Sequence, residues 1–329
     1  MAKTAFVIVF AVLLAANVGQ ARPYRAPRTS FGQPDLQGVW TNLSLTALER
    51  PKDFDALVVP PDKAADYDRR HGAKPPPVPG DPVGSVDTEW YDGAALARIG
   101  GEARSSWIVD PADGQLPYSE AGRRRLAAAT AGGPPAGPEA RAPNERCLLG
   151  LAGVSGPPML NARYNANYQI VQAPGAVALV IEMNHDVRII RIGERKRPAA
   201  GVRAWMGDSV GWWEGDTLVA ETTGFHPQES LRGRGGSLLW MSADAKVTER
   251  FTRVSPTQIL YEFTVEDAAT FTRPWRGQMM LNATRGPIYE FACHEGNYSL
   301  TGILAGARAA EREQAARSVA AKPGGTNSH

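Results

Sequence analysis

From Asn167 onward, runs rich in β-branched and aromatic residues recur at regular spacing, and each run ends at a group of turn-forming residues. Pro-Gly, Glu-Gly-Asp, Ser-Pro-Thr and Thr-Arg-Gly-Pro separate the runs. This regular spacing predicts an antiparallel sheet, either a meander or a closed barrel. We expect strands in NYQIVQA, AVALVIEMNHDVRIIRI, SVGWWEG, DTLVAETTGF, AKVTERFTRVS, TQILYEFTVED, RPWRGQMMLN and PIYEFACHEG.

The segment from residue 22 to 149 has a different pattern, because proline, glycine and alanine interrupt every hydrophobic run. Stretches such as KPPPVPGDPVG cannot form regular structure. We expect short strands in DLQGVWTN and on both sides of the turn in SSWIVDPADGQLPYS, and one helix that begins at Ser119. The segment is predicted to wrap a core formed by residues 150–301. A helix from about Gly302 to Val319 and a disordered tail should complete the chain.

The first residues have the layout of a secretory signal peptide. A lysine precedes an apolar stretch from Ala5 to Ala16, and small residues precede Arg22. We expect cleavage after Ala21. The alternative, an uncleaved membrane anchor, needs about 20 apolar residues, and this stretch is shorter. The mature protein is therefore expected to be soluble, in a bacterial periplasm or outside the cell, with no association with a membrane.

Export limits the possible chemistry. Diffusible cofactors are not freely supplied outside the cytoplasm, and the sequence contains no Walker-type loop, dinucleotide fingerprint, haem-attachment motif or HExxH zinc helix. The formal net charge is +2, and the basic residues are spread along the chain. The sequence therefore shows no cluster of basic residues of the kind that binds nucleic acid. We expect a small-molecule partner and no cofactor.

The sequence has two cysteines, Cys147 and Cys293. In an oxidising compartment one disulfide is the leading interpretation, and it would tie the segment before the core to the last core strand. Two buried free thiols are the alternative. A Cys293–His294 catalytic dyad is disfavoured, because adjacent residues of a strand point to opposite faces.

Several charged residues fall inside predicted strands: Glu182, Arg188, Glu221, Glu249, Arg250 and Glu262. Some of them should lie on a solvated outer face. In a closed barrel the others would face the lumen, where paired charges form a ligand site. A bulge in MNHDVR could reset the alternation, so the faces cannot all be assigned.

Two histidines lie among acids and apolar strand residues and are the candidate proton carriers. His185 and His294 could exchange a proton near neutral pH, with Glu182 or Glu295 orienting one of them. We predict that both histidines face a common, metal-free pocket. Other candidates are phenolic donors, an anion-binding arginine, a lumenal glutamate and an apolar wall for an aromatic substrate: Tyr168, Tyr289, Tyr298, Arg188, Glu262, Trp212, Trp213 and Trp275.

The Gly-x-Trp at residues 38–40 resembles the start of lipocalins, which implies a lipocalin-like barrel. The runs YNANYQIVQAPGAVALVIEMNHDVRIIRI, GDSVGWWEGDTLVAETTGF, ERFTRVSPTQILYEFTVED and GPIYEFACHEGNYSL resemble a large family of exported bacterial proteins of mostly unknown function. This resemblance covers roughly residues 146 to 304. The family is in turn similar to the lignin-dimer γ-formaldehyde lyases. It implies cofactor-independent C–C cleavage of a phenylcoumaran-type substrate with release of formaldehyde.

Other functions remain open at this point. A non-catalytic lipocalin-like carrier of an apolar ligand would need only the barrel, export and the tryptophans. Hydrolysis or isomerisation could use the same acid–base groups. A metal site formed by His185, His294 and a glutamate is a further alternative, although no short ligand pair marks it.

Overall fold

The structure is a computed structural model that describes residues 24–73, 92–131, 137–150, 153–193, 196–199, 201–233, 238–295 and 297–320. The predicted signal peptide, at residues 1 to 21, and the tail after residue 320 lie outside these ranges. No helix within the described residues is both long and apolar enough to cross a membrane.

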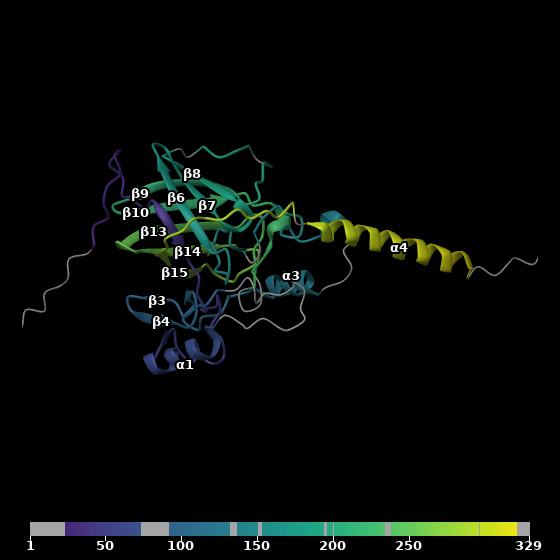
Figure 1. Ribbon diagram of the computed structural model, residues 1–329, viewed down its shortest axis with the longest axis horizontal. Helices are drawn as coiled ribbons and strands as arrows, with labels where there is room; N and C mark the ends of the chain where they lie inside the picture. The colour runs from purple at the N-terminus through teal and green to yellow at the C-terminus, as the bar shows by residue number, and fades with distance from the viewer. Residues whose placement is uncertain are drawn as a thin grey trace, which may run out of the picture.

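In the described residues nine strands close into a barrel (Figure 1). In order around the barrel they are β1 (Gly38–Thr41), β6 (Asn167–Ala173), β7 (Ala176–Ile181), β8 (Val187–Ile192), β9 (Asp208–Glu214), β10 (Thr217–Thr223), β13 (Lys246–Ser255), β14 (Gln258–Glu266) and β15 (Trp275–Ala283). Trp40 of β1 pairs with both Tyr168 of β6 and Ala283 of β15, which closes the ring. A short strand, β5 (Ile108–Asp110), pairs with β15 as well. The predicted mainly β barrel is confirmed, and it takes β1 from outside the expected 150–301 core.

The alternation that predicted the strands is visible in the burial of β13 and β14, where every second residue is buried over most of the length. The inward side chains of all nine strands pack into one hydrophobic cluster, which includes Trp40, Leu179, Phe251 and Trp275. The barrel therefore has a filled core, as expected for a small barrel.

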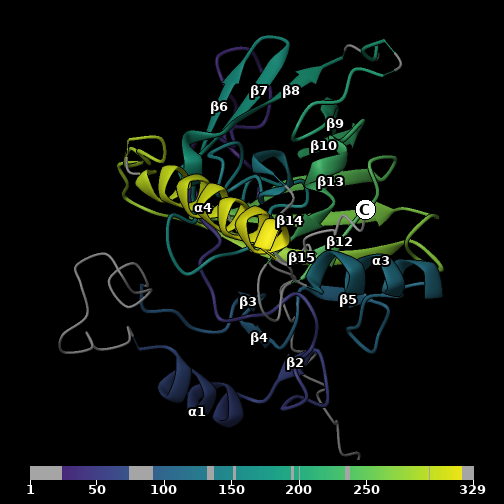
Figure 2. The same ribbon diagram turned by 90° about the vertical axis from the view of Figure 1, so that its right-hand side faces the viewer.

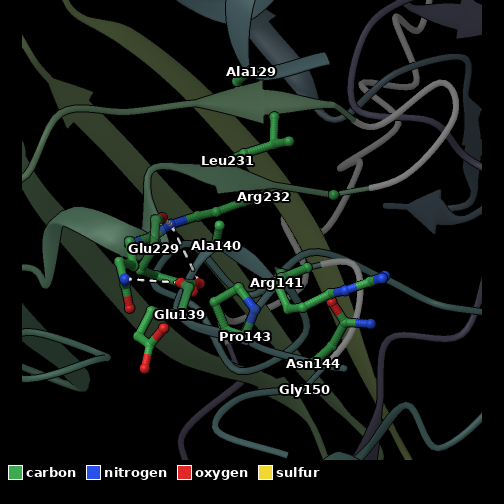
Figure 3. Close-up of a pocket in the computed structure, with 14 residues that line it drawn as sticks. Ala129, Glu139, Ala140, Arg141, Pro143, Asn144, Gly150, Glu229, Leu231 and Arg232 are labelled. Atoms are coloured by element: carbon green, nitrogen blue, oxygen red, sulfur yellow. Dashed lines mark hydrogen bonds and ion pairs between the residues drawn. The ribbon is translucent and has the colours of Figure 1, made fainter. Parts of the chain in front are cut away.

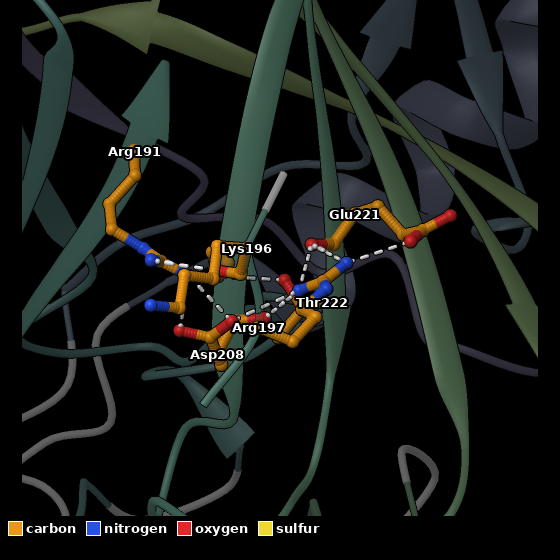
Figure 4. A network of polar contacts seen from close by, with 7 residues as sticks. Arg191, Lys196, Arg197, Asp208, Glu221 and Thr222 are labelled. Atoms are coloured by element: carbon orange, nitrogen blue, oxygen red, sulfur yellow. Dashed lines mark hydrogen bonds and ion pairs between the residues drawn. The ribbon is translucent and has the colours of Figure 1, made fainter. Parts of the chain in front are cut away.

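One pair of neighbouring strands, β8 and β9, is parallel, so the predicted all-antiparallel pairing is wrong at this point. A parallel pair requires a crossover connection, and here the connection runs from residue 193 to 207. Arg197 on this crossover donates to Glu221 Oε1 of β10 at 2.7 Å and to Asp208 of β9 (Figure 4). Arg191 of β8 binds the same Asp208 at 2.8 and 2.9 Å. These ion pairs hold the crossover against the barrel.

AVALVIEMNHDVRIIRI is not one strand but a hairpin, β7 and β8, joined by the short 3-10 turn η3 (Met183–His185). Asn184 and His185 have φ angles of 61° and 46°, in the left-handed region that asparagine tolerates better than most residues. The turn closes with a hydrogen bond from Ile181 N to Asp186 O, 2.8 Å long. His185 therefore lies in a turn and not in a strand.

The predicted strand in PIYEFACHEG is also absent, since residues 284–295 have no strand assignment. β1 already occupies the free edge of β15, so no edge remains for a further strand to join. The segment instead follows the barrel end, where Thr284 N donates to Val39 O.

The N-terminal segment contains more regular structure than predicted. The helix α1 (Pro61–His71) packs with a three-stranded sheet of β2 (Val58–Val59), β3 (Arg98–Ile99) and β4 (Glu102–Arg104) beside the barrel (Figures 1 and 2). The proline at the first position of α1 and the glycine after its end are sequence signals of a helix that the composition of this segment concealed.

The predicted helix after Ser119 is confirmed as α3 (Glu120–Thr130), and the Ser119 hydroxyl accepts from Gly122 N at 3.0 Å. The C-terminal helix α4 (Tyr298–Ala320) projects away from the barrel (Figure 1). The remaining elements, which lie close to the barrel, are η1 (Pro138–Ala140), η4 (Pro227–Glu229), β11 (Leu231–Arg232) and β12 (Leu239–Trp240).

Candidate functional site

A buried ion pair lies inside the barrel. Arg188 of β8 donates from Nη1 to Glu249 Oε1 of β13 at 3.1 Å, and from Nη2 to Glu249 Oε2. Tyr261 of β14 donates its hydroxyl to Glu249 Oε1 at 2.7 Å. Burial, and secondly the Glu249 carboxylate, raise the pKa of Tyr261 well above its ordinary value, so the phenol remains a hydrogen-bond donor. The carboxylate thus has the partners that a buried charge needs.

The chain segment 153–160 packs against the barrel core next to this ion pair. Met159 N donates to the Tyr261 hydroxyl at 3.1 Å, and Tyr168 donates its own hydroxyl to Val154 O at 3.1 Å. Val154 and Met159 are almost fully buried. The segment, which we call the plug, is therefore part of the buried core.

Arg232 of β11 and Glu229 of η4 lie next to the plug. Both are buried, with 3% and 7% of the residue exposed. Arg232 donates from Nε to Glu229 O at 3.0 Å and from Nη1 to Pro157 O. The same Nε is 3.7 Å from Glu229 Oε1. The guanidinium also lies 4.7 Å from the centre of the Phe225 ring.

This environment changes the proton affinity of both groups. Burial raises the pKa of the Glu229 carboxyl to about 7; the Arg232 guanidinium opposes the rise, and the Asp186 carboxylate adds to it. Burial also lowers the pKa of Arg232, which the Glu229 charge opposes and the Arg188 charge assists. A carboxyl group that titrates near neutrality beside a cation is suited to general acid–base catalysis.

Glu229 and Arg232 line a cavity of about 470 Å³ (Figure 3). The opposite wall comes from residues 139–144, and Gly150 and Gly153 also border the cavity. Gln228 donates from Nε2 to Glu139 O at 3.1 Å, which joins the two walls. The volume suits a small molecule.

The predicted disulfide Cys147–Cys293 is present in the structure, with its Cα atoms 5.7 Å apart. It ties the wall segment 139–150 to the segment that precedes α4. Gly150 N donates to Asp186 Oδ2 at 3.0 Å, and Asn297 donates to Glu145 O at 2.9 Å. One covalent bond and several hydrogen bonds therefore hold this wall against the barrel. A disulfide is compatible with an extracellular or periplasmic protein.

The structure does not bring the two predicted catalytic histidines together in a described cavity. His185 and His294 are both exposed, and neither lines any of the four cavities described for this chain. The described residues also contain no group of three or more histidine, cysteine and acidic side chains placed to hold a metal ion. Both histidines lie in turns at the surface, and their acidic neighbours in the sequence do not indicate a buried site.

The other predicted residues are distributed over several sites. Glu182 is buried and accepts from Asn167 Nδ2 at 2.8 Å and from Tyr289 N at 3.1 Å. Tyr168 and Trp275 belong to the barrel core, and burial raises the pKa of Tyr168.

The remaining candidates lie at the surface or on the outside of the barrel. Trp212 donates to Glu214 at 2.8 Å, and Glu262 accepts from Gln278 at 2.8 Å. Glu295 and Tyr298 are exposed.

Of the six charged strand residues, only Arg188 and Glu249 point inward and pair with each other. Glu221, Arg250 and Glu262 point outward, as expected for a solvated face. Glu182 follows the end of β7 and belongs to the turn. The lumen therefore holds one ion pair in an apolar core.

Sequence reasoning missed Glu229 and Arg232. They lie in HPQESLRGRGG, which shows neither a strand nor a helix period. The spacing of an acid and a base three residues apart after a proline is a weak signal, because it is common on protein surfaces. In the structure the plug, the wall segment 139–150 and the Phe225 ring surround the pair.

Comparison of the chain with protein-family models finds no match, and a search of curated proteins finds no significant match.

Proposed function

We propose that this protein is an acid–base enzyme that acts on a small molecule in the Glu229–Arg232 cavity. The observation that carries the proposal is a buried carboxyl group with a pKa of about 7, placed beside a buried guanidinium at the wall of a 470 Å³ cavity. Half of such carboxyl groups are ionised near neutral pH, so Glu229 can both accept and donate a proton. Arg232 supplies a fixed positive charge for an oxygen that becomes anionic.

The substrate we propose is a phenylcoumaran-type alcohol, as the sequence resemblance implies. Glu229 takes the proton of the γ-hydroxyl, and the bond between the β and γ carbons breaks to release formaldehyde. The electron pair of that bond forms a double bond to the benzylic carbon, whose bond to the ring oxygen breaks. Arg232 stabilises the phenolate, which takes the proton back from Glu229. Atoms and charge balance without a cofactor.

The same two groups would serve hydrolysis or isomerisation of another small molecule, with Glu229 activating water or moving a proton within the substrate. A carrier that holds an apolar ligand inside the barrel has less support. The inward side chains form one packed cluster that fills the barrel interior, so a ligand would bind in the cavity outside the barrel.

The test is an assay of phenylcoumaran-type alcohols for formaldehyde and for the stilbene product. Glu229→Gln should lower turnover by roughly 10²-fold or more, the usual size of a general acid–base contribution. Glu266→Gln is the matched control, because Glu266 forms an exposed ion pair with Lys246 outside the cavity. Equal turnover by the two variants would contradict the role of Glu229. If the protein turns over only other hydroxylated aromatic compounds, the proposed site would stand and the proposed substrate would be wrong.

A further inference from the structure

A second cavity, of about 520 Å³, lies at the barrel next to β1 and β6 and shares no lining residue with the Glu229–Arg232 cavity. It is bordered by two carboxylates, Glu182 and Asp92, and by two tyrosines, Tyr164 and Tyr289. No lysine or arginine is among its described lining residues. The wall is therefore acidic and aromatic.

Glu182 is the most unusual member of this wall, because only 2% of it is exposed. Its carboxylate accepts from two neutral donors, the Asn167 amide and the Tyr289 backbone N–H, and among the described residues it forms no ion pair. The two hydrogen bonds fix its position, and within the described ranges no cation pairs with its negative charge. A buried carboxylate without a cation is costly, and proteins usually supply one.

The nearby Arg163 does not line the cavity. Its Nη2 donates to the carbonyl oxygens of Ala73 and Asp92 at 3.2 and 3.3 Å. The Asp92 residue is exposed, and its backbone N–H is held by Arg163 O at 2.9 Å. A ligand that enters the cavity can thus reach one buried and one exposed carboxylate.

We propose that this cavity binds a small organic amine, with its ammonium group held by Glu182 and Asp92 and its carbon body packed on Tyr164 and Tyr289. An ammonium group supplies the missing positive charge and three hydrogen-bond donors. Tyrosine rings attract cations through their faces and also pack against apolar groups. An anion would meet two like charges, and a neutral molecule would leave the Glu182 charge unpaired.

The probe is 2-phenylethylamine, which is cationic at neutral pH, titrated into the full chain by calorimetry at low ionic strength. Two molecules of the same size serve as controls: 2-phenylethanol, which is neutral, and phenylacetate, which is an anion. We expect saturable binding of the amine that depends on Glu182, with no binding of either control that depends on Glu182. Butylamine should bind more weakly than 2-phenylethylamine, because it lacks the ring that packs on the tyrosines.

Two substitutions place the binding in this cavity. Glu182→Gln retains the shape and removes the charge, and we expect it to weaken amine binding by roughly 10-fold or more. Asp92→Asn tests the exposed carboxylate without disturbing a buried group, and we expect a smaller loss. Glu266→Gln should bind as the unchanged chain does. Circular dichroism checks that each variant is folded.

The proposal is overturned if the amine does not bind, if both carboxylate variants retain full affinity for it, or if Glu182→Gln weakens binding of 2-phenylethanol as much as binding of the amine. Because the Glu229–Arg232 cavity is itself proposed to bind aromatic alcohols, each result is read as the binding that Glu182→Gln removes, which isolates the second cavity. None depends on turnover at Glu229, so the proposed acid–base function stands or falls separately.

Discussion

Arg188 and Glu249 are 61 residues apart in the chain, and they form a bidentate ion pair in the interior of the barrel, where both are almost fully buried. Removal of one partner would leave the other charged in an apolar core. Glu249→Gln should therefore destabilise the fold by about 3–5 kcal/mol, as measured by urea denaturation.

The matched control is the exposed pair between Arg250 and Glu214, whose atoms approach to 2.8 Å. Glu214→Gln should change the free energy of unfolding by less than about 1 kcal/mol, because solvent screens exposed ion pairs. Similar losses for the two variants would mean that the interior pair has no special electrostatic role.

The raised pKa of Glu229 predicts a dependence of stability on pH. The folded protein holds this proton more tightly than the unfolded chain, whose glutamates have a pKa near 4.5. The contribution is fully present below pH 4.5 and is lost as the pH rises through about 7, by up to about 3 kcal/mol. Thermal or urea unfolding of Glu229→Gln across this range should show a flatter pH dependence than the unchanged chain. A parallel pair of curves would contradict the assignment.

The disulfide is predicted to hold the cavity wall as well as the fold. Cys147 and Cys293 are 146 residues apart, and a link that closes such a long loop stabilises a chain by about 5 kcal/mol in the loop-entropy description. The double Cys147→Ser and Cys293→Ser variant should therefore unfold at lower denaturant. Hydrogen exchange should rise in residues 139–150 more than in β13 or β14. Two alkylatable thiols in the unreduced, denatured protein would show that the bond does not form.

The Ser119 hydroxyl caps α3 and also donates to Thr270 O at 2.9 Å. Ser119→Ala removes both bonds and should destabilise the protein by about 1–2 kcal/mol. Ser119→Asp retains an acceptor for Gly122 N and should recover part of the loss. Equal stability of the unchanged chain and Ser119→Ala, measured by thermal unfolding, would show that α3 does not contribute to the cooperative fold.

Much of the barrel could be predicted from the sequence because the patterns that indicate its strands lie within short stretches of the chain. The alternating pattern of β13 and β14 reports which side chains face the core, and the Ser119 cap marks where α3 begins. The two cysteines could be paired because the chain has no others. Each of these features depends on residue types at short range.

The structural features that were predicted wrongly depend on contacts between segments that are distant in the sequence. The turn at Asn184 and His185 interrupts an apolar run that could equally be a strand, and the parallel β8–β9 pair depends on the long connection between these two strands. The histidines had suitable neighbours, but sequence does not report exposure. Glu229 became a candidate only because the plug at residues 153–160 and the wall at residues 139–150 bury it beside Arg232.

The central claim is that Glu229 exchanges a proton near neutrality beside the Arg232 cation. The most direct measurement is a carbon-13 NMR titration of the glutamate carboxyl groups, with Glu229→Gln used to assign the signal. We predict a pKa of about 7 for Glu229 and a further rise in Arg232→Gln, because the guanidinium favours the ionised carboxylate. A Glu229 carboxyl that titrates near 4.5 in the folded protein, with no change in Arg232→Gln, would contradict the claim.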